Sequence, residues 1–465
     1  MMIKTIEELP VELLIPKADQ PYEVPENWVW TKLGHLVFVK TGKRDANHGT
    51  EDGQYPFFTC ASEPINSPTF SFEGESILLP GNGANVGLVL YFDGKFEAYQ
   101  RTYVLQPKCR VSLKYIYFQL LLGWKVYNDS RQYGSATNYI KLENITKYPI
   151  PLPPLLEQKR IVERVELLLA KLQEANRRVE DIPEIVRSIR KSIITNAFIG
   201  SSTENWRRNN PGYSSSILLD DLKGKTLGKT KNKIKQDLSF EPPTIPDSWN
   251  WAILFNISEI QGGITKGKMY NGETTIELPY LRVANVQDGF LELNEVKKIK
   301  CLQGDMHKYE LKEGDLLFTE GGDRDKLGRC AVWNNEIKDC IHQNHIFRAR
   351  ILKGVFPEYI AYFTKTKFAK EYFFNNASQT VNLASINITV LGNLPIPIPP
   401  VEEQMQIIKI INSLYEKIEK IENIYMYTKE KIQNIEESIL SRAFRGDFGT
   451  NDLKEKNALE ILKQI

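Results

Sequence analysis

Four side chains of metal-binding type lie close together in the sequence: Cys330, Cys340, His342 and His345. Thiolates and imidazoles are preferred zinc ligands. The spacing, in which nine residues separate the two cysteines and Cys-x-His-x-x-His follows, differs from that of structural zinc sites. Both histidines also fall at the start of a predicted strand. The pattern therefore favours a polar structural role over a metal site.

The run Gly224–Thr230 (GKTLGKT) is similar at first sight to a phosphate-binding loop. That loop requires four residues between its glycines, whereas three stand here, and no strand precedes them. The sequence also lacks a Gly-x-Ser-x-Gly nucleophile motif, a glycine fingerprint for a dinucleotide or S-adenosylmethionine, and the Asn/Asp-Pro-Pro-aromatic tetrad of base methylation. These patterns predict a protein that binds its target rather than one that reacts with it.

The elements that would position binding residues occur twice. Pro149–Pro154 (PIPLPP) and Glu157-Gln158 return as Pro395–Pro400 (PIPIPP) and Glu403-Gln404, 246 residues later. The same offset relates the Ala-Phe-x-Gly segments 197–200 and 443–446. Upstream, Pro25–Trp30 (PENWVW) matches Pro246–Trp251 (PDSWNW) at a shorter offset. The chain is therefore a tandem duplication whose two variable parts differ by 25 residues.

Each proline-rich segment precedes a sustained heptad of apolar residues, which predicts a coiled-coil helix about 65 Å long at ~1.5 Å per residue. Pro183 should kink or locally break the first helix, whereas Lys429 at the matching position should not interrupt the second. Gly200 and Gly446 suit a left-handed helix stop. The two predicted seams consist of Ile161, Val165, Leu168, Leu172, Ala175, Val179, Ile182, Val186, Ile189 and Ile193, and of Ile407, Ile411, Leu414, Ile418, Ile421, Tyr425, Thr428, Ile432, Ile435 and Ile439.

Each predicted helix needs a partner, and the other copy is the nearest one. Antiparallel packing of the two helices would generate a pseudo-twofold axis and place a variable domain at each end of a spacer. A bare dimerisation rod is the alternative interpretation.

The variable domains have the signature of mixed α/β structure, which makes the fold class α+β. We predict strands at 37–39, 55–58, 76–79, 86–92 and 101–105 in the first, and at 278–283, 315–318, 330–333 and 346–350 in the second. One helix is predicted in each, at 113–122 and at 357–368.

Composition sets the broad class. The 465 residues suffice for several domains, and 42% of them are hydrophobic. The net charge of +2 means that nucleic-acid binding would depend on local patches. Five scattered cysteines favour a reducing compartment. No apolar run approaches the ~18 residues of a membrane span. We therefore expect a soluble cytoplasmic protein.

The ordered, duplicated motifs resemble those of the specificity subunit of a type I restriction–modification system. They comprise the Pro-x-x-Trp-x-Trp entry, the Pro-Ile/Leu-Pro-Pro-x-x-Glu-Gln-x-x-Ile junction and the Ala-Phe-x-Gly exit. The resemblance spans almost the whole chain. Segments 314–322 and 342–348 also look similar to this family.

The resemblance implies a non-catalytic DNA-recognition subunit. Each variable domain would be a target recognition domain that reads one half of a bipartite asymmetric DNA sequence. Two long antiparallel coiled-coil helices would fix the spacing and dock two methyltransferase (modification) subunits. Two restriction/translocase subunits would complete the complex. S-adenosylmethionine, ATP and Mg would bind to those partners, with no cofactor or metal in this chain.

On this interpretation the chain divides into six parts. These are the first target recognition domain with an N-terminal extension (1–150), the first spacer helix (151–200), a linker (201–240), the second target recognition domain (241–395), the second spacer helix (396–449) and a C-terminal tail helix (450–465). The linker contains the basic run 223–233, which suggests a solvated tether or a contact with phosphates.

Amide, hydroxyl, aromatic and basic side chains in loops are the candidates for DNA contact, because they read base edges and hold phosphates. In the first domain the candidates are Lys43, Arg44, Asn82, Asn85, Arg101, Arg131, Gln132, Tyr133, Ser135, Thr137, Asn138 and Tyr139. In the second they are Lys266, Lys268, Arg282, Asn285, Arg324, Lys326, Arg329, Gln343, Asn344, Asn376, Ser378, Gln379, Thr380 and Asn382. A capping or surface role is an equal alternative for each residue.

A coiled-coil scaffold that holds two non-DNA ligand-binding domains is the alternative function, followed by an unrecognised nuclease or hydrolase. The sequence alone leaves open the DNA sequence recognised, its spacer length, the methylated base and the activity of the host complex.

Overall fold

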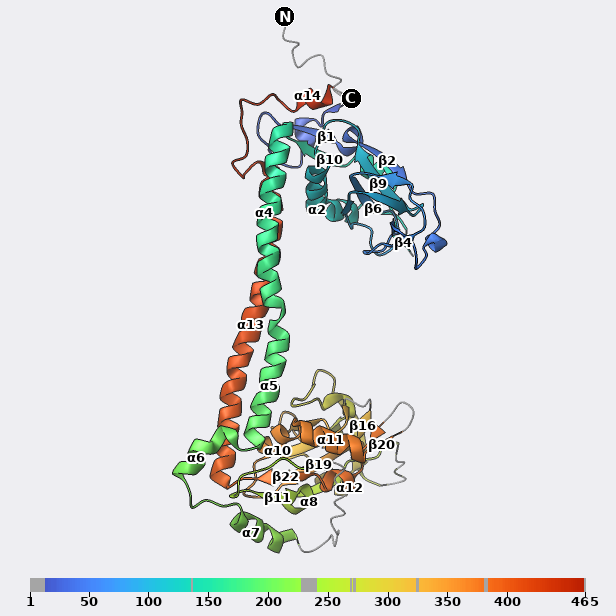
Figure 1. The fold of residues 1–465 in the computed structure, drawn as a ribbon. Helices are drawn as coiled ribbons and strands as arrows, with labels where there is room; N and C mark the ends of the chain where they lie inside the picture. Colours follow the sequence, from blue (N-terminus) through green and yellow to red (C-terminus); the bar gives the residue numbers. More distant parts are fainter. Residues whose placement is uncertain are drawn as a thin grey trace, which may run out of the picture. The chain divides into compact units, whose positions relative to one another are not determined.

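The computed structural model describes residues 13–134, 137–226, 241–267, 270, 273–322, 326–379 and 384–463, without the side chains of 223–226, 322 and 379. The chain forms two compact units, shown in Figure 1. Unit 1 comprises Met1–Asp181 and Tyr425–Ile465, and unit 2 comprises Ile182–Ile424. Each unit therefore combines one variable domain with helical segments from both copies of the repeat.

Unit 1 contains a two-stranded ribbon, two four-stranded sheets and a set of helices. The ribbon is β1 (Val29–Lys32) with β10 (Pro149–Leu152). The first sheet has the order β2 (Val37–Thr41), β9 (Thr102–Pro107), β6 (Ser76–Pro80) and β7 (Leu90–Phe92), and the second the order β4 (Ile65–Ser67), β3 (Tyr55–Phe58), β8 (Lys95–Ala98) and β5 (Phe72–Glu73). The helices are η3 (Lys17–Asp19), α1 (Leu33–Leu36), η4 (Ala46–His48), α2 (Leu113–Asp129), α3 (Leu142–Thr146), α4 (Leu155–Glu180) and α14 (Leu459–Leu462).

Unit 2 repeats this plan with a different covering layer. Its ribbon is β11 (Asn250–Ile253) with β22 (Pro395–Ile398), and its main sheet has the order β12 (Ser258–Gly262), β19 (Ile346–Ile351), β15 (Asp315–Thr319) and β17 (Cys330–Val332). Two three-stranded sheets follow, β14 (Lys297–Leu302), β13 (Thr275–Leu281) and β18 (Ile341–His342), and β16 (Gly321–Gly322), β21 (Ala384–Ser385) and β20 (Ser378–Gln379). The helices are α5 (Ile182–Phe198), η5 (Ser201–Thr203), α6 (Glu204–Asn209), α7 (Ser216–Thr226), α8 (Leu254–Ile257), η6 (Val283–Asn285), η7 (Gln303–Asp305), α9 (Met306–Tyr309), α10 (Pro357–Phe363), α11 (Lys367–Asn376) and α12 (Ile388–Gly392). Helix α13 (Val401–Arg445) contributes to both units.

The repeated motifs have a structural explanation that the sequence analysis missed. The proline-rich segments are strands, and each pairs antiparallel with the Trp-x-Trp segment of its own copy, Trp30 facing Pro151 and Trp251 facing Pro397. Proline lacks an N–H, so it suits a two-stranded ribbon better than a central strand. Tyr115 donates a hydrogen bond to the Pro151 carbonyl at 2.6 Å.

The Glu-Gln pairs are fully buried anchors. The Trp28 indole N–H donates to Glu157 at 2.8 Å, and the Trp249 indole donates to Glu403 at the same distance. Gln158 accepts from the backbone N–H of Ser112 at 2.8 Å, which fixes the start of α2. In unit 2, Gln404 and Phe356 repeat this contact before α10. Each motif therefore joins the ribbon, a domain helix and the start of a long helix.

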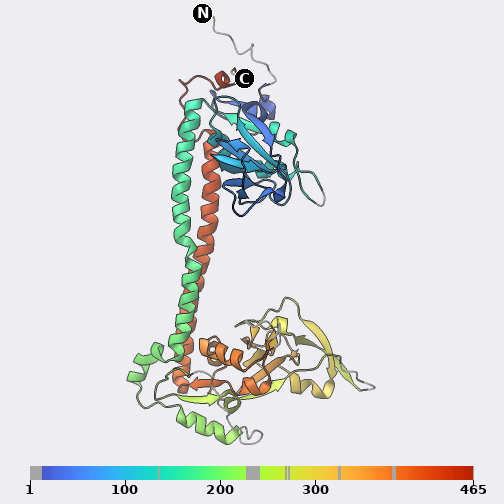
Figure 2. The ribbon, with the colours of Figure 1, turned by 45° about the vertical axis from the view of Figure 1, so that its right-hand side comes forward.

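The long helices pack antiparallel within each unit. In unit 1, Lys429 of α13 donates to Asn176 of α4 at 2.9 Å, and Thr450 beyond α13 contacts Glu157 at the start of α4. In unit 2, Arg190 of α5 pairs with Glu422 of α13 at 2.8 Å. The helices lie side by side in Figures 1 and 2. At the ends of the two seams Ile161, Ile407 and Ile439 are buried and Ile193 is partly buried, whereas Ala175, Ile189, Ile421 and Ile435 are exposed.

Several predictions about the helices are confirmed. The first long helix ends at Glu180 and α5 begins at Ile182, so Pro183 lies in a first turn, where proline is tolerated. The second helix, α13, is continuous over 45 residues. Gly200 and Gly446 have φ values of 80° and 79°. A Cβ at Gly200 would approach Pro246 to 2.4 Å, and one at Gly446 would approach Pro25 to 2.5 Å, which links each helix end to an entry motif.

Other predicted bounds were wrong. The strand expected at 86–92 is reduced to Leu90–Phe92, and the helix expected at 357–368 is split into α10 and α11 around Thr364. Helix α2 continues to Asp129. Part of the predicted linker is helical, and Leu222 of α7 is buried in the core of unit 2. The rest of the basic run, 227–233, lies outside the described residues.

Candidate nucleic-acid interface

Three loop segments of unit 1 meet at one end of the main sheet. The backbone N–H of Gly81 donates to the Arg101 carbonyl at 2.8 Å, and the N–H of Ile140 donates to the Gly81 carbonyl at 2.9 Å. Asn82 forms a β-bridge with Tyr139. We call residues 81–82, 99–101 and the described part of 133–139 the variable edge of unit 1. A fourth segment with predicted DNA-contact residues joins these three, because Arg44 forms a β-bridge with Tyr99.

Aromatic and cationic groups are stacked along this edge. The rings of Tyr133 and Tyr139 stack with centroids 5.6 Å apart, and the Lys141 ammonium lies 4.1 Å from the Tyr133 centroid. Arg131 covers the ring of Tyr127 at 4.3 Å. Arg101, Thr137 and Asn138 are exposed, and Tyr139 is 38% exposed. The edge thus presents a guanidinium, amides and ring faces to solvent.

Unit 2 builds the corresponding edge with the same backbone connections. The N–H of Glu320 donates to the His345 carbonyl at 3.0 Å, and the N–H of Ile386 donates to the Glu320 carbonyl at 2.7 Å. Ser378 pairs with Ser385, as Tyr133 does with Tyr139. We call residues 320–321, 343–345 and the described part of 378–385 the variable edge of unit 2.

The two edges differ in side chains at matching positions. Tyr99-Gln100-Arg101 in unit 1 corresponds to Gln343-Asn344-His345 in unit 2, because both follow strands that pair in parallel with their neighbours. Gly81-Asn82 corresponds to Glu320-Gly321, and the stacked tyrosines correspond to serines. One frame therefore presents two chemically unlike polar surfaces.

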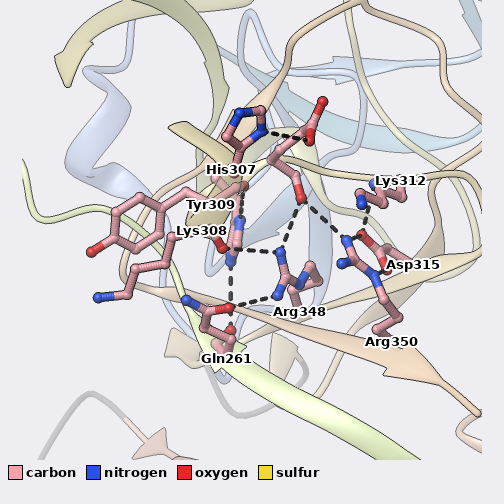
Figure 3. A network of polar contacts seen from close by, with 10 residues as sticks. Gln261, His307, Lys308, Tyr309, Lys312, Asp315, Arg348 and Arg350 are labelled. Carbon is pink, nitrogen blue, oxygen red and sulfur yellow. Dashed lines mark hydrogen bonds and ion pairs between the residues drawn. The ribbon is translucent and has the colours of Figure 1, made fainter. Parts of the chain in front are cut away.

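A buried polar network supports the variable edge of unit 2 (Figure 3). Arg348, which is 5% exposed, donates to the carbonyls of Lys308 and Glu310 at 3.2 and 2.9 Å and to the Gln261 side chain at 2.6 Å. His342, directly before the edge, faces the carbonyl oxygens of Tyr309 and Gln261. Burial and the nearby Arg348 charge lower the pKa of His342 to about 4, so its ring is neutral at neutral pH.

The matching space in unit 1 is apolar. Val104 and Ala98 stand where Arg348 and His342 stand in unit 2, and they pack with Phe58, Leu78 and Phe96. Gln106 hydrogen-bonds Ser76 at 3.2 Å in place of the ion pair of Arg350 with Asp315 at 2.7 Å. These positions therefore differ in chemistry between the two units, whereas the strand order of the main sheet is the same.

Some predicted contact residues have structural roles instead. Asn285 is 3% exposed and its amide donates to the carbonyls of Glu292 and Glu295, so we withdraw it as a DNA contact. The Asn85 amide donates to the Cys60 carbonyl, and the Asn376 amide to the Tyr372 carbonyl. Arg282 pairs with Glu295, and Arg329 donates to the Gln287 side chain at 2.7 Å.

The remaining predicted residues divide into three groups. Lys43, Arg44, Gln132 and Lys266 belong to loops next to the edges, and Arg44 pairs with the buried Glu97 at 3.6 Å. The Lys326 carbonyl accepts from Thr319 at 3.0 Å, directly before the unit 2 edge. Ser135, Lys268, Arg324, Thr380 and Asn382 lie outside the described residues, as does the side chain of Gln379.

Three residues at or next to the variable edges were not among the predicted DNA contacts: Cys60, Glu320 and His345. The Cys60 thiol donates to Asn82 at 3.0 Å, and the His345 ring contacts the Glu320 carboxylate. Arg101 was predicted, and His345 follows from it once a 244-residue offset is applied to this strand. The proline junction has a different offset of 246 residues, so the sequence repeat alone did not reveal the match.

No group of three potential ligands suited to a metal occurs in the described parts of the chain. All five cysteines are free thiols. Among the helices that the structure describes, none combines the length and apolar character needed to cross a bilayer.

The fold defines a protein with two structurally related but chemically unlike polar edges. Comparison with known proteins gives the family. The sequence profile described as "Type I restriction modification DNA specificity domain" matches residues 25–183 and 247–426, and the chain belongs to this family. It is a specificity subunit with a role in DNA recognition.

Relatives extend over most of the chain. It is 29% identical over 439 residues to the type I restriction enzyme EcoDI specificity subunit of Escherichia coli. This match covers 91% of this chain and 89% of the relative. It is 28% identical over 320 residues to the EcoKI specificity subunit of E. coli K12, covering 68% and 61%. A solved structure from a study of the assembly and conformational transition of the type I R-M system shares the fold, with a TM-score of 0.60, 17% identity and coverage of 92% of this chain and 100% of the other.

Proposed function

We propose that each variable edge reads one half of a bipartite, asymmetric DNA target. The observation that carries this proposal is the pairing of one backbone frame with two unlike sets of side chains. Arg101 and Gln100 in unit 1 match His345 and Asn344 in unit 2. Different side chains on the same frame would select different bases.

The chemistry of the edges fits base and phosphate contacts. Guanidinium groups bind guanine and amides bind adenine through paired hydrogen bonds, worth roughly 1–3 kcal/mol of discrimination each. Arg101, Gln100 and Asn138 are exposed in unit 1. In unit 2, Gln343 and Asn344 are partly exposed. The other predicted contact residues on these loops would bind the phosphate backbone of the DNA.

We propose that α4, α5 and α13 fix the spacing between the half-sites and dock two methyltransferase subunits. Several apolar side chains of α13 are exposed, most of all Ile424 in unit 2 at 65%, and Met426 and Tyr427 in unit 1 at 65% and 60%. A methyltransferase subunit docked on α13 would cover these side chains.

Two restriction/translocase subunits would join the larger complex. S-adenosylmethionine, ATP and Mg would bind to the partners, and this chain would be non-catalytic. The complex would act in the cytoplasm, on DNA.

Methylome sequencing of the host, with and without the gene, tests the proposal. We expect a two-part motif with a fixed gap to be methylated only when the gene is present. Identical methylation in both strains, or a motif without a gap, would contradict it.

A further inference from the structure

A cationic groove in unit 2 lies between the long helices and α11. Its lining includes five cationic side chains and only two carboxylates. Arg190 and Lys191 come from α5, Lys365 precedes α11, and Lys367 and Lys370 lie on α11. Tyr415 of α13 and Phe374 of α11 complete the walls.

Three of the cations are partly neutralised. Arg190 pairs with Glu422 at 2.8 Å, Lys367 with Glu371 at 3.4 Å and Lys370 with Asp288 at 3.2 Å. In the described part of the chain, Lys191 and Lys365 have no carboxylate at ion-pair distance. Lys365 is half-buried, with its ammonium 5.6 Å from the Tyr362 ring centroid, and burial lowers its pKa. The groove therefore holds an excess of positive charge.

The repeat supplies an internal comparison. At the 246-residue offset of the long helices, Arg190 and Lys191 correspond to Glu436 and Glu437. At the 244-residue offset that relates Tyr115 to Tyr359, the three lysines correspond to Leu121, Gly123 and Val126. The frame does not require these cations, because the other copy folds with acidic and apolar residues in their place. Their presence in unit 2 points to a ligand.

We propose that this groove binds the DNA phosphate backbone beside the half-site read by unit 2. The inference rests on the proposed function. Helix α11 connects the groove to the variable edge, because only Ala377 separates the end of the helix from Ser378 of the edge. Its ten residues span about 15 Å. That length corresponds to about four base-pair steps of ~3.4 Å, so a duplex that lies on the edge and runs along α11 would place phosphates at the groove.

Charge also favours DNA as the occupant. Phosphate contacts made by lysine and arginine fix register without reading sequence, and they release condensed counterions. A groove with unpaired lysines next to a base-reading edge fits that role. Because the cations of the groove occur in unit 2 and are replaced in unit 1, we expect unit 2 to contribute more to the salt dependence of DNA binding than unit 1.

The test uses the complex of the chain with its modification subunits and duplexes with or without the methylated motif. Lys191→Gln, Lys367→Gln and Lys370→Gln are combined, and affinity is measured across KCl concentrations. We expect the slope of log K against log [salt] to become shallower by about 0.9 for each phosphate that is no longer neutralised, up to roughly 3. The ratio of affinities for the two duplexes should stay the same, and arginine at the three positions should preserve the slope.

The control changes three exposed lysines of unit 2 outside the groove, Lys312, Lys338 and Lys353, to glutamine. It alters net charge equally and should leave the slope within about 0.5 of the wild-type value. An unchanged slope in the groove variant, or an equal change of slope in the control, overturns the inference. The proposed function is still supported in that case if the complex prefers the duplex with the methylated motif. Failure of the groove variant to assemble, with a normal slope for the complex that forms, would assign the groove to a protein partner and also overturn it. Absence of sequence preference in the wild-type complex would remove the proposed function itself.

Discussion

Glu157 and Glu403 occupy matching places but have different surroundings. Both are fully buried and accept a hydrogen bond from a tryptophan. Glu403 also pairs with Arg207 at 2.6 Å, whereas burial is the main influence on Glu157 and raises its pKa above the ordinary 4.5. The same residue type therefore acts as an ion-pair partner in unit 2 and as a more weakly compensated acid in unit 1.

These surroundings predict opposite responses to removal of the charge. Glu403→Gln deprives Arg207 of its partner and should lower the free energy of unfolding by about 1–3 kcal/mol. Glu157→Gln should gain stability relative to wild type as pH rises. Folded Glu157 holds its proton more tightly than unfolded Glu157. Its favourable contribution is therefore complete below the ordinary pKa and is lost as pH rises through the raised pKa.

Urea unfolding of both variants and wild type, from acidic to mildly alkaline pH, provides the measurement. The two variants serve as matched controls, since each removes one carboxylate from the same place in the repeat. A pH-independent difference between Glu157→Gln and wild type would show that burial does not shift this acid.

Individual contact residues were the part least accessible to sequence reasoning. Asn285 and Asn344 are both amides that the sequence analysis placed in loops, yet Asn285 is buried and makes three hydrogen bonds with the backbone, whereas Asn344 belongs to the variable edge. The local backbone distinguishes them, because Asn285 ends the short helix η6, where its side chain accepts from the Arg282 N–H, whereas Asn344 follows strand β18. His345 was missed because its strand has a different repeat offset from the proline junction.

At the scale of elements, the helices were more predictable than the strands. Heptads, Pro183 and the two terminal glycines identified the bounds of the long helices, because each signal acts locally. The proline-rich strands β10 and β22 were missed, since proline normally argues against a strand. Each pairs with a Trp-x-Trp segment that is distant in the sequence.

The helix pairing in unit 1 predicts a sharp contrast between neighbouring residues. Leu168 packs against the core, whereas Leu167 is 49% exposed. Leu168→Asp places a carboxylate in an apolar contact and should lower the free energy of unfolding by about 2–4 kcal/mol. Leu167→Asp, its control, should change it by less than about 0.5 kcal/mol. Equal denaturation midpoints for the two variants would contradict the packing.

At the scale of the whole molecule, the duplication explains why one chain contains two unlike surfaces. The anchors shared by both copies, such as Trp28–Glu157 and Trp249–Glu403, lie in the ribbons and helix starts. The divergent parts lie between β1 and β10 and between β11 and β22. A variable domain is thus connected to the shared frame through its two ribbon strands, which allows replacement of the domain without loss of the frame.

Exchange of residues 25–150 for the corresponding segment of another specificity subunit tests this account most directly. The methylated motif of a host carrying the exchanged chain is determined by methylome sequencing. We predict that one half of the motif changes to that of the donor while the other half and its asymmetry remain. Changes in both halves, or in neither, would contradict the claim that each unit reads its own half-site.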